Sequence, residues 1–189
     1  MPRTRTFIGI ELTKPIRDRL VALQEALADA APDVKWVEPE NLHVTQLFLG
    51  EVDDRELPAV CRAVQAAVAE YAAFPLSVAG AGCFPNPRRP RVLWVGVEQG
   101  IQDVVAVHDA MERALLELGC YRREERKYTP HITLGRVRRE GPTDLLARAL
   151  AQYQGWKAGE LTVQEIHVMA SQLTPQGPAY SILSRAKLG

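Results

Sequence analysis

The stretches Leu42-His43-Val44-Thr45 and Pro130-His131-Ile132-Thr133 repeat one pattern, His-x-Thr with a β-branched residue in the middle. Two of the four histidines of the chain lie in this pattern. Side chains alternate between the two faces of a β-strand, so the histidine and threonine of each copy are expected to share a face. An imidazole transfers protons near neutral pH, and a hydroxyl donates hydrogen bonds. The repeat therefore indicates chemistry on a phosphate, with one histidine as base and the other as acid.

The two motifs belong to a larger internal duplication. Residues 7–11 resemble residues 94–98, because each is an apolar strand with a central glycine and a final glutamate. Gly9 and Gly96 are 87 residues apart, and the two motif histidines are 88 apart. A helix-like segment follows each of these strands. We therefore expect residues 1–189 to form a single domain of two similar lobes, each contributing one His-x-Thr strand to a shared cleft.

Composition and charge are those of an ordinary globular protein. The chain has 189 residues, of which 47% are hydrophobic and 24% charged, enough for one compact unit with a substantial core. The formal net charge is zero, which argues against charge-driven coating of duplex nucleic acid. Three cysteines without CxxC spacing fit a reducing compartment, and the N-terminus has no long apolar stretch. We expect a monomer in the cytoplasm without membrane contact.

Hydrophobic periodicity predicts alternating strands and helices, and hence an α+β fold without a dividing linker. The predicted strands cover residues 6–12, 34–37, 42–49, 76–81, 91–97, 131–137, 161–170 and 180–184. The predicted helices cover residues 14–30, 57–71, 100–119 and 143–152. A Pro-rich loop is predicted between residues 83 and 90.

The other two histidines have simpler interpretations. His108 falls in the apolar stripe of a predicted helix, so we expect a core histidine. His167 lies between two apolar residues that alternation places on the other face, which indicates a structural or solvent-facing role. A single His-x-Thr unit would carry little weight, because threonine favours strands in any case. Duplication is what favours a functional role for His43 and His131.

Beyond the motifs, much of the chain resembles a known family. The paired His-x-Thr units are similar to those of the 2H phosphoesterases, in particular the bacterial and archaeal RNA 2′,3′-cyclic phosphodiesterases, also known as 2′-5′ RNA ligases. The similar segments are Arg5–Ile10, Trp36-Val37, Asn41–Thr45, Phe48–Glu51, Gly82–Pro85, Pro90–Trp94, Pro130–Arg136, Ser171–Leu173 and Gly177–Tyr180.

One position departs from the family pattern. The family has an apolar residue where this chain has Gln46, as Leu134 is in the second motif. By alternation Gln46 points away from His43 and Thr45, toward the side that should pack on helices. A buried amide there needs hydrogen-bond partners.

The resemblance implies a fold and a reaction. The implied fold has two pseudo-symmetric lobes whose antiparallel sheets form a concave central cleft, with the helices outside. The implied reaction is metal-independent hydrolysis of an RNA or nucleoside 2′,3′-cyclic phosphate to a 2′-phosphate, without a cofactor, with 2′-5′ RNA ligation as a side activity. The implied partners are RNA with cyclic phosphate ends or cyclic nucleotides.

The resemblance also assigns roles to residues. It makes His43 the proton donor and His131 the proton acceptor, although the residues alone do not order the two. Thr45 and Thr133 would donate hydrogen bonds to the non-bridging phosphate oxygens. Arg136 would bind the phosphate, since a guanidinium stabilises a developing anionic phosphorane. Arg136 comes five residues after His131 and so leaves the face that strict alternation gives the histidine.

Some alternatives remain open. Phe84, in the Pro-rich loop, would stack on the nucleobase or would instead anchor that loop in the core. A non-catalytic module that binds nucleotides or RNA ends could have the same fold. A metallohydrolase is less consistent, because the sequence lacks HExxH or a His, Cys and carboxylate cluster at metal-ligand spacing.

Overall fold

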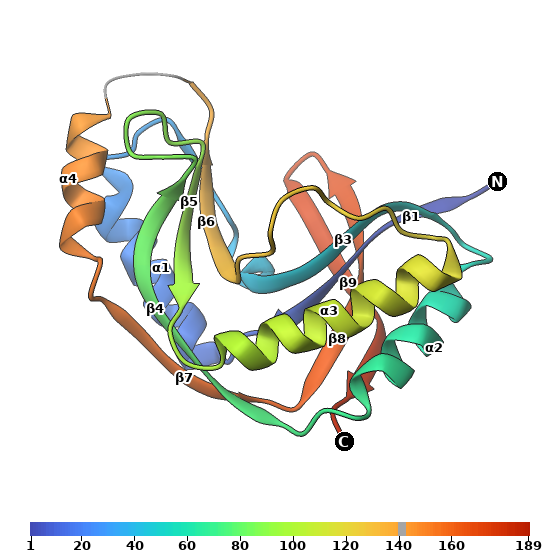
Figure 1. Ribbon diagram of the computed structural model, residues 1–189. Helices are drawn as coiled ribbons and strands as arrows, with labels where there is room; N and C mark the ends of the chain where they lie inside the picture. Colours follow the sequence, from blue (N-terminus) through green and yellow to red (C-terminus); the bar gives the residue numbers. More distant parts are fainter. Residues whose placement is uncertain (140–142) are drawn as a thin grey trace.

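The computed structural model describes residues 1–139 and 143–189 (Figure 1). The strands are β1 (Arg3–Glu11), β2 (Val34–Trp36), β3 (His43–Asp53), β4 (Phe74–Phe84), β5 (Val92–Val97), β6 (His131–Val137), β7 (Lys157–Val163), β8 (Glu165–Thr174) and β9 (Gly177–Lys187). The helices are α1 (Lys14–Ala28), α2 (Leu57–Val68), α3 (Ile101–Leu118) and α4 (Asp144–Gln152), with a short 3₁₀ turn at Pro39–Asn41. The predicted α+β class is confirmed.

One curled antiparallel sheet passes through both lobes. The strand order is β7-β4-β5-β6-β3-β1-β8-β9, and β2 pairs with β6 beside this path. Counted outward from the centre, β3-β1-β8-β9 forms the first lobe and β6-β5-β4-β7 forms the second. The lobes join where Val44 pairs with Ile132. The predicted pair of lobes with antiparallel sheets is therefore confirmed, with the two half-sheets fused into one curled, concave sheet (Figure 1).

The helices that follow β1 and β5 each pack on the opposite lobe. Helix α1 leaves β1 and packs against β7 and α4 in the second lobe. Helix α3 leaves β5 and packs against α2 and β3 in the first lobe (Figure 1). The two duplicated strand–helix units are thus intertwined. Neither lobe has its complete helix layer without the other.

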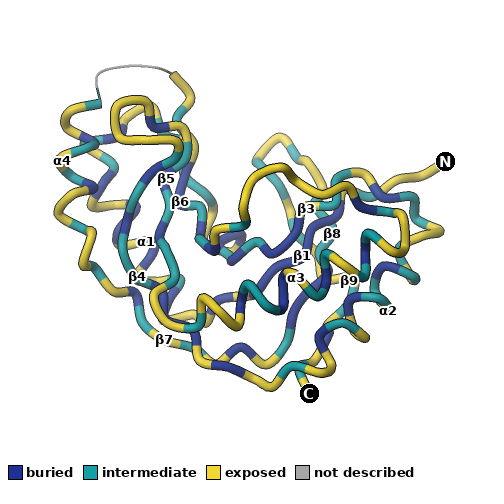
Figure 2. The backbone as a smooth tube through the Cα atoms, viewed as in Figure 1, coloured by how far each residue is buried: buried dark blue, intermediate teal, exposed yellow. Residues whose placement is uncertain are grey.

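The core lies between the helices and the sheet. The helices bury apolar residues at helical spacing, for example Ile16, Leu20, Leu23 and Leu27 in α1. Burying each such side chain contributes roughly 1.5–3 kcal/mol. Figure 2 shows the buried positions along the strands and on the inner sides of the helices, while the outer sides are exposed. Within the described residues no helix has the length and apolar character needed to cross a membrane.

Two predicted segments differ in the structure. Residues 161–170 were expected to form one strand, but the chain leaves β7 at Val163 and enters β8 at Glu165, and these two strands belong to different lobes. Strand β4 extends to Phe84, which pairs with Val92. Phe84 therefore lies in the sheet, and its predicted place in the Pro-rich loop is wrong.

The two glycines that suggested the duplication are not equivalent in space. Gly9 pairs with Thr45, whereas Gly96 pairs with His131. The residue that pairs with Thr133, and so corresponds to Gly9, is Trp94. The duplication itself is real in the strand order, but the glycine alignment is two residues out of register.

Candidate active site

The two His-x-Thr motifs meet at the centre of the sheet. Because Val44 and Ile132 pair in antiparallel strands, the two motifs lie side by side and run in opposite directions. Val44 and Ile132 are fully buried toward the helices. The four motif side chains lie on the other face, which we call the open face, and each is partly exposed: His43, Thr45, His131 and Thr133.

Each motif histidine is oriented by a backbone carbonyl two residues earlier. Nδ1 of His43 donates to the carbonyl of Asn41 at 2.6 Å, and Nδ1 of His131 donates to the carbonyl of Thr129 at 2.7 Å. Because a carbonyl only accepts, each Nδ1 carries a proton, and Nε2 is the acceptor of the neutral ring. The hydroxyl of Thr45 donates to Nε2 of His43 at 2.7 Å. In both imidazoles Nε2 is therefore the nitrogen available for proton transfer.

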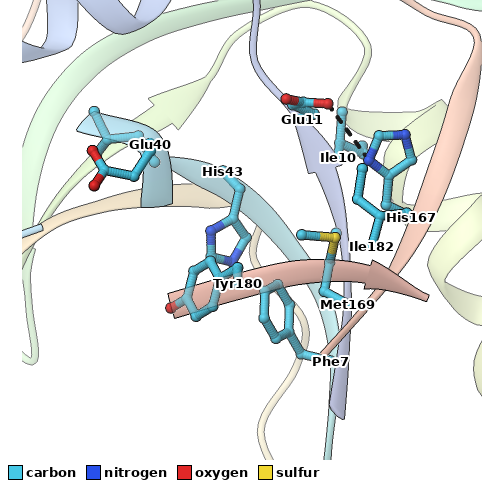
Figure 3. Close-up of a pocket in the computed structure, with 11 residues that line it drawn as sticks. Phe7, Ile10, Glu11, Glu40, His43, His167, Met169, Tyr180 and Ile182 are labelled. Atoms are coloured by element: carbon cyan, nitrogen blue, oxygen red, sulfur yellow. Dashed lines mark ion pairs between the residues drawn. The ribbon is translucent and has the colours of Figure 1, made fainter. Parts of the chain in front are cut away.

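His43 packs among aromatic rings. Its ring centroid lies 4.8 Å from that of Phe7 and 5.6 Å from that of Tyr180 (Figure 3). Burial lowers the pKa of His43 from its ordinary value of 6.5. The hydrogen bond to Asn41 opposes this shift in pKa, and the charge of His131 adds to it. His131 is thus close enough for its charge to affect His43.

A pocket adjoins His43 on the side of the first lobe (Figure 3). Its wall is mainly apolar and comes from Phe7, Met169, Tyr180 and Ile182, on β1, β8 and β9. The acidic side chains that also line it are Glu11 and Glu40. An apolar wall with a few polar groups is the usual lining of a small-molecule site.

His131 has aromatic neighbours of its own. The Phe84 ring meets His131 edge-on at a centroid distance of 5.1 Å, and it lies 5.1 Å from the ring of Trp94. Trp94 lies directly over Gly82, where an added Cβ would collide with the indole. Phe84 is partly exposed on the open face beside the second histidine. This position allows contact with a ligand, which a loop anchor in the core would not.

A β-bulge returns Arg136 to the open face. Thr133 pairs with Trp94, and Arg136 pairs with Val92, so three steps along β6 match two steps along β5. The extra residue is Leu134. Since Val92 and Trp94 share a face, Arg136 shares the face of Thr133. The expectation from strict alternation is therefore wrong, and the exposed Arg136 lies on the same face as the motif side chains.

Strand β3 has the matching bulge, and Gln46 is its extra residue. Thr45 pairs with Gly9, while Leu47 pairs with Ile8. Gln46 is only 2% exposed, and within the described residues neither atom of its amide has a hydrogen-bond partner. An unpaired buried polar group costs about 1–3 kcal/mol. The departure from the family pattern thus affects stability beneath the first motif, while the open face is unchanged.

The other two histidines have structural environments. His108 is 7% exposed, and its Nδ1 lies 2.9 Å from the Asp109 carboxylate, so the predicted core histidine is confirmed. His167 is 3% exposed, which excludes the solvent-facing alternative. Its Nε2 lies 2.6 Å from Glu165. Its Nδ1 lies 3.6 Å from Glu11, the ion pair marked in Figure 3. Both ring nitrogens of His167 therefore already have carboxylate partners.

The structure adds one connection that the sequence did not indicate. Tyr128 lies three residues before the second motif, and its hydroxyl donates to the carbonyl of Thr45 in the first motif at 2.8 Å. Its ring stacks on His108 at 4.0 Å. Burial raises the pKa of the Tyr128 hydroxyl well above its usual value of 10, so it remains a donor. Nothing in the local pattern around Tyr128 signals this long-range bond.

Several residues of the site could be identified only from the structure. Asn41 and Thr129 act through their backbone carbonyls, which any residue type could supply, so no sequence signal marks them. Tyr180 lies in a segment that resembles the family, and this was its only signal. Within residues 1–139 and 143–189, no group of three or more His, Cys, Asp or Glu side chains could hold a metal ion.

Two half-sheets that join at paired His-x-Thr strands define a 2H phosphoesterase. The profile of the 2′-5′ RNA ligase superfamily matches residues 13–174. The RNA 2′,3′-cyclic phosphodiesterase of Methanothermobacter thermautotrophicus is 36% identical over 179 residues, which cover 95% of this chain and 96% of that protein. The chain belongs to the 2′-5′ RNA ligase superfamily.

Solved structures show the same fold. A crystal structure of a Thermus thermophilus protein superposes with a TM-score of 0.82 at 27% identity, covering 97% of each chain. Escherichia coli LigT complexed with 3′-AMP gives a TM-score of 0.77 at 25% identity, covering 98% of each chain. The intertwined two-lobe sheet is therefore the architecture of these relatives as well.

Proposed function

We propose that this protein hydrolyses the 2′,3′-cyclic phosphate of RNA ends or nucleosides to a 2′-phosphate. The observation that carries the proposal is the placement of two His-x-Thr motifs side by side on one open face, each imidazole oriented through Nδ1. Relatives named RNA 2′,3′-cyclic phosphodiesterase match nearly the whole chain, and a LigT structure contains 3′-AMP. Ligation of 2′-5′ linkages would use the same groups in reverse and is a side activity in this proposal.

The proposed step is an in-line displacement at phosphorus. His131 takes a proton from a water molecule as the water oxygen forms a bond to phosphorus. The bond from phosphorus to O3′ breaks, its electron pair stays on O3′, and His43 gives that oxygen a proton. The attacking and leaving oxygens lie on opposite sides of phosphorus, which suits histidines supplied by two different strands. No metal ion and no cofactor takes part in this step.

The lowered pKa of His43 fits this role once substrate is bound. In the free protein burial favours the neutral ring. A phosphate anion beside His43 opposes this lowering of its pKa, because opposite charge favours the protonated form. The hydroxyl of Thr45 then leaves Nε2 of His43 and donates to a non-bridging phosphate oxygen. Thr133 donates to a second non-bridging oxygen beside His131.

Arg136 and Phe84 complete the proposed site. The exposed guanidinium of Arg136 stabilises the negative charge that builds up on the phosphorane oxygens. Phe84, which is partly exposed, stacks on the nucleobase. We further propose that the chain works as a single domain and a monomer, since each lobe supplies one histidine of the pair. The proposed location is the cytoplasm.

Product analysis tests this proposal. An RNA oligonucleotide with a 2′,3′-cyclic phosphate end is incubated with the protein in EDTA, and the product is compared by chromatography with 2′- and 3′-phosphate standards. We expect the 2′-phosphate alone. A 3′-phosphate product would contradict the assigned regiochemistry, and loss of activity in EDTA would contradict metal independence. Tight binding without conversion would identify a non-catalytic RNA-end-binding module.

A further inference from the structure

Arg5 brings a second guanidinium to the open face, in the first lobe. Arg5 pairs with Glu51 in the register of β1 and β3, and it is two residues from Phe7 and four from Gly9, so it shares their face. Its guanidinium carbon lies 4.6 Å from the ring centroid of Phe48. A cation over an aromatic face is attracted by the ring quadrupole. The contact with Phe48 therefore orients Arg5 before any ligand binds.

The pseudo-symmetry of the sheet relates the place of Arg5 to that of Arg136 in the other lobe. Phe48 and Arg136 each come five residues after a motif histidine and follow the matching bulges. Where the second lobe has the guanidinium of Arg136, the first lobe has a ring with Arg5 above it. The open face thus has a guanidinium beyond the motif histidine in each lobe. In the described part of the chain neither arginine is a member of an ion pair.

Tyr180 packs beside His43 and lies within electrostatic reach of Arg5. Its ring lies 4.8 Å from that of Phe7 and 5.6 Å from that of His43. Burial raises the pKa of the Tyr180 hydroxyl, and the positive charges of Arg136 and Arg5 oppose this rise. The hydroxyl is therefore within electrostatic reach of both guanidinium groups. Arg5 belongs to the same surface as the proposed reaction centre.

A polar groove leads from Arg5 away from the histidines. Strands β1 and β8 pair from Gly9–His167 to Thr6–Ala170, and the groove opens beyond this paired stretch. Its polar lining includes Arg3, Thr4, Arg5, Glu51, Ser171 and Gln172. Hydroxyl, amide and guanidinium donors of this kind suit a sugar-phosphate chain.

We propose that Arg5 binds the phosphodiester that joins the terminal nucleotide of the RNA to the one before it, and that the groove receives the chain beyond. This inference rests on the proposed function. The backbone of Arg5 lies about 13 Å along β1 from that of Gly9, from four residues at about 3.3 Å each. Arg136 binds the reacting phosphate, and Arg5 binds the next phosphate along the RNA chain. The contact makes RNA a better substrate than a cyclic mononucleotide.

The test compares three substrates with the wild-type protein and Arg5→Gln. They are cytidine 2′,3′-cyclic phosphate, a ribonucleotide trimer that ends in it, and that trimer with an uncharged methylphosphonate at its last internal linkage. We expect Arg5→Gln to lower kcat/KM for the trimer by about tenfold or more, as for a lost charged hydrogen bond, and to leave the mononucleotide nearly unchanged. The methylphosphonate should lower kcat/KM of the wild type by a similar factor and should leave kcat/KM of Arg5→Gln unchanged.

Arg148→Gln on α4 is the matched control, because Arg148 lies on a helix of the second lobe. It should leave all three rates unchanged. Equal losses on the mononucleotide and the trimer in Arg5→Gln would overturn the inference by placing Arg5 at the reacting nucleotide. Unchanged rates on both would overturn it by showing that the contact is absent.

The inference can fail separately from the proposed function. If the wild type hydrolyses neither cyclic phosphate, the proposed function is wrong, and affinity for a trimer with a 2′-phosphate end is measured against salt concentration instead. Loss of one phosphate contact in Arg5→Gln should reduce the slope of log affinity against log salt by about 0.7. An unchanged slope would contradict the role of Arg5.

Discussion

The ring of Phe7 lies 4.8 Å from the imidazole of His43, so an apolar residue of β1 controls the hydration of the first motif histidine. Gly9, two residues further along β1, leaves room for the same imidazole. A Cβ at Gly9 would lie 3.1 Å from Cδ2 of His43. The charged form of a desolvated imidazole is disfavoured. Burial therefore favours the neutral form of His43 in the free protein, and in the proposed mechanism the negative charge of the substrate favours its protonated form.

We expect His43 to titrate below 6.5 in the free protein, because burial lowers its pKa. It stays neutral at neutral pH and takes up a proton only as the pH falls through the lowered pKa. Phe7→Ala admits water and should raise the pKa toward 6.5. NMR titration of the His43 resonances in both proteins provides the measurement. A pKa above 6.5 in the free protein, or no rise in Phe7→Ala, would contradict the assignment.

Arg136→Gln should reduce kcat/KM for the cyclic mononucleotide and for the oligonucleotide alike, by about 10²–10³-fold, as for the loss of a transition-state donor. Arg136→Lys keeps the charge but loses the two-pronged geometry of the guanidinium, so it should restore only part of the rate. Steady-state kinetics on both substrates provide the measurement. A loss confined to the oligonucleotide would place Arg136 on the RNA chain and away from the reacting phosphate.

Phe84→Ala should chiefly weaken nucleotide binding. Stacking of a base on an aromatic ring contributes about 1–3 kcal/mol, which predicts a fall in affinity of roughly fivefold or more. Calorimetry with cytidine 2′-monophosphate measures the effect, and inorganic phosphate is the control ligand because it has no base. Phe84→Tyr retains the ring and should bind normally. Unchanged nucleotide affinity in Phe84→Ala would return this residue to a purely structural role.

Gln46→Leu should stabilise the protein by about 1 kcal/mol, because it replaces an unpaired buried amide with an apolar side chain. The reciprocal change Leu134→Gln, at the matching bulge, should destabilise by about 1–3 kcal/mol. Urea unfolding of the two variants and the wild type gives the free energies of unfolding. Destabilisation by Gln46→Leu would show that the amide has partners that stabilise it.

The sequence predicted the parts of the site that depend on local pattern. Alternation within each His-x-Thr unit was sufficient to put His43 with Thr45 and His131 with Thr133. The apolar stripe of a helix was sufficient to bury His108. The duplication predicted two lobes, because an internal repeat that keeps its order also keeps its fold. These are properties of residues close together in the chain, or of a pattern that is repeated whole.

The wrong or missing predictions have one physical cause, which is the pairing between distant strands. Strict alternation takes Arg136 off the face of His131, because the bulge at Leu134 depends on the register with β5. The single strand predicted for residues 161–170 breaks at Gln164, because the segments on either side pair with β4 and with β1. Helices α1 and α3 each pack on the lobe opposite to the strand that they follow, and the hydrophobic periodicity of the sequence does not indicate this. Long-range pairing has to be seen in the structure.

The central claim is that two histidines of one open face share the acid–base work. The most direct test measures single-turnover hydrolysis of a 2′,3′-cyclic-phosphate oligonucleotide by the wild type, His43→Ala and His131→Ala in EDTA, with circular dichroism to confirm folding. The account predicts a 2′-phosphate product from the wild type and a rate lower by about 10²–10⁴-fold in each variant. A folded variant of either histidine that turns over at nearly the wild-type rate would contradict the account.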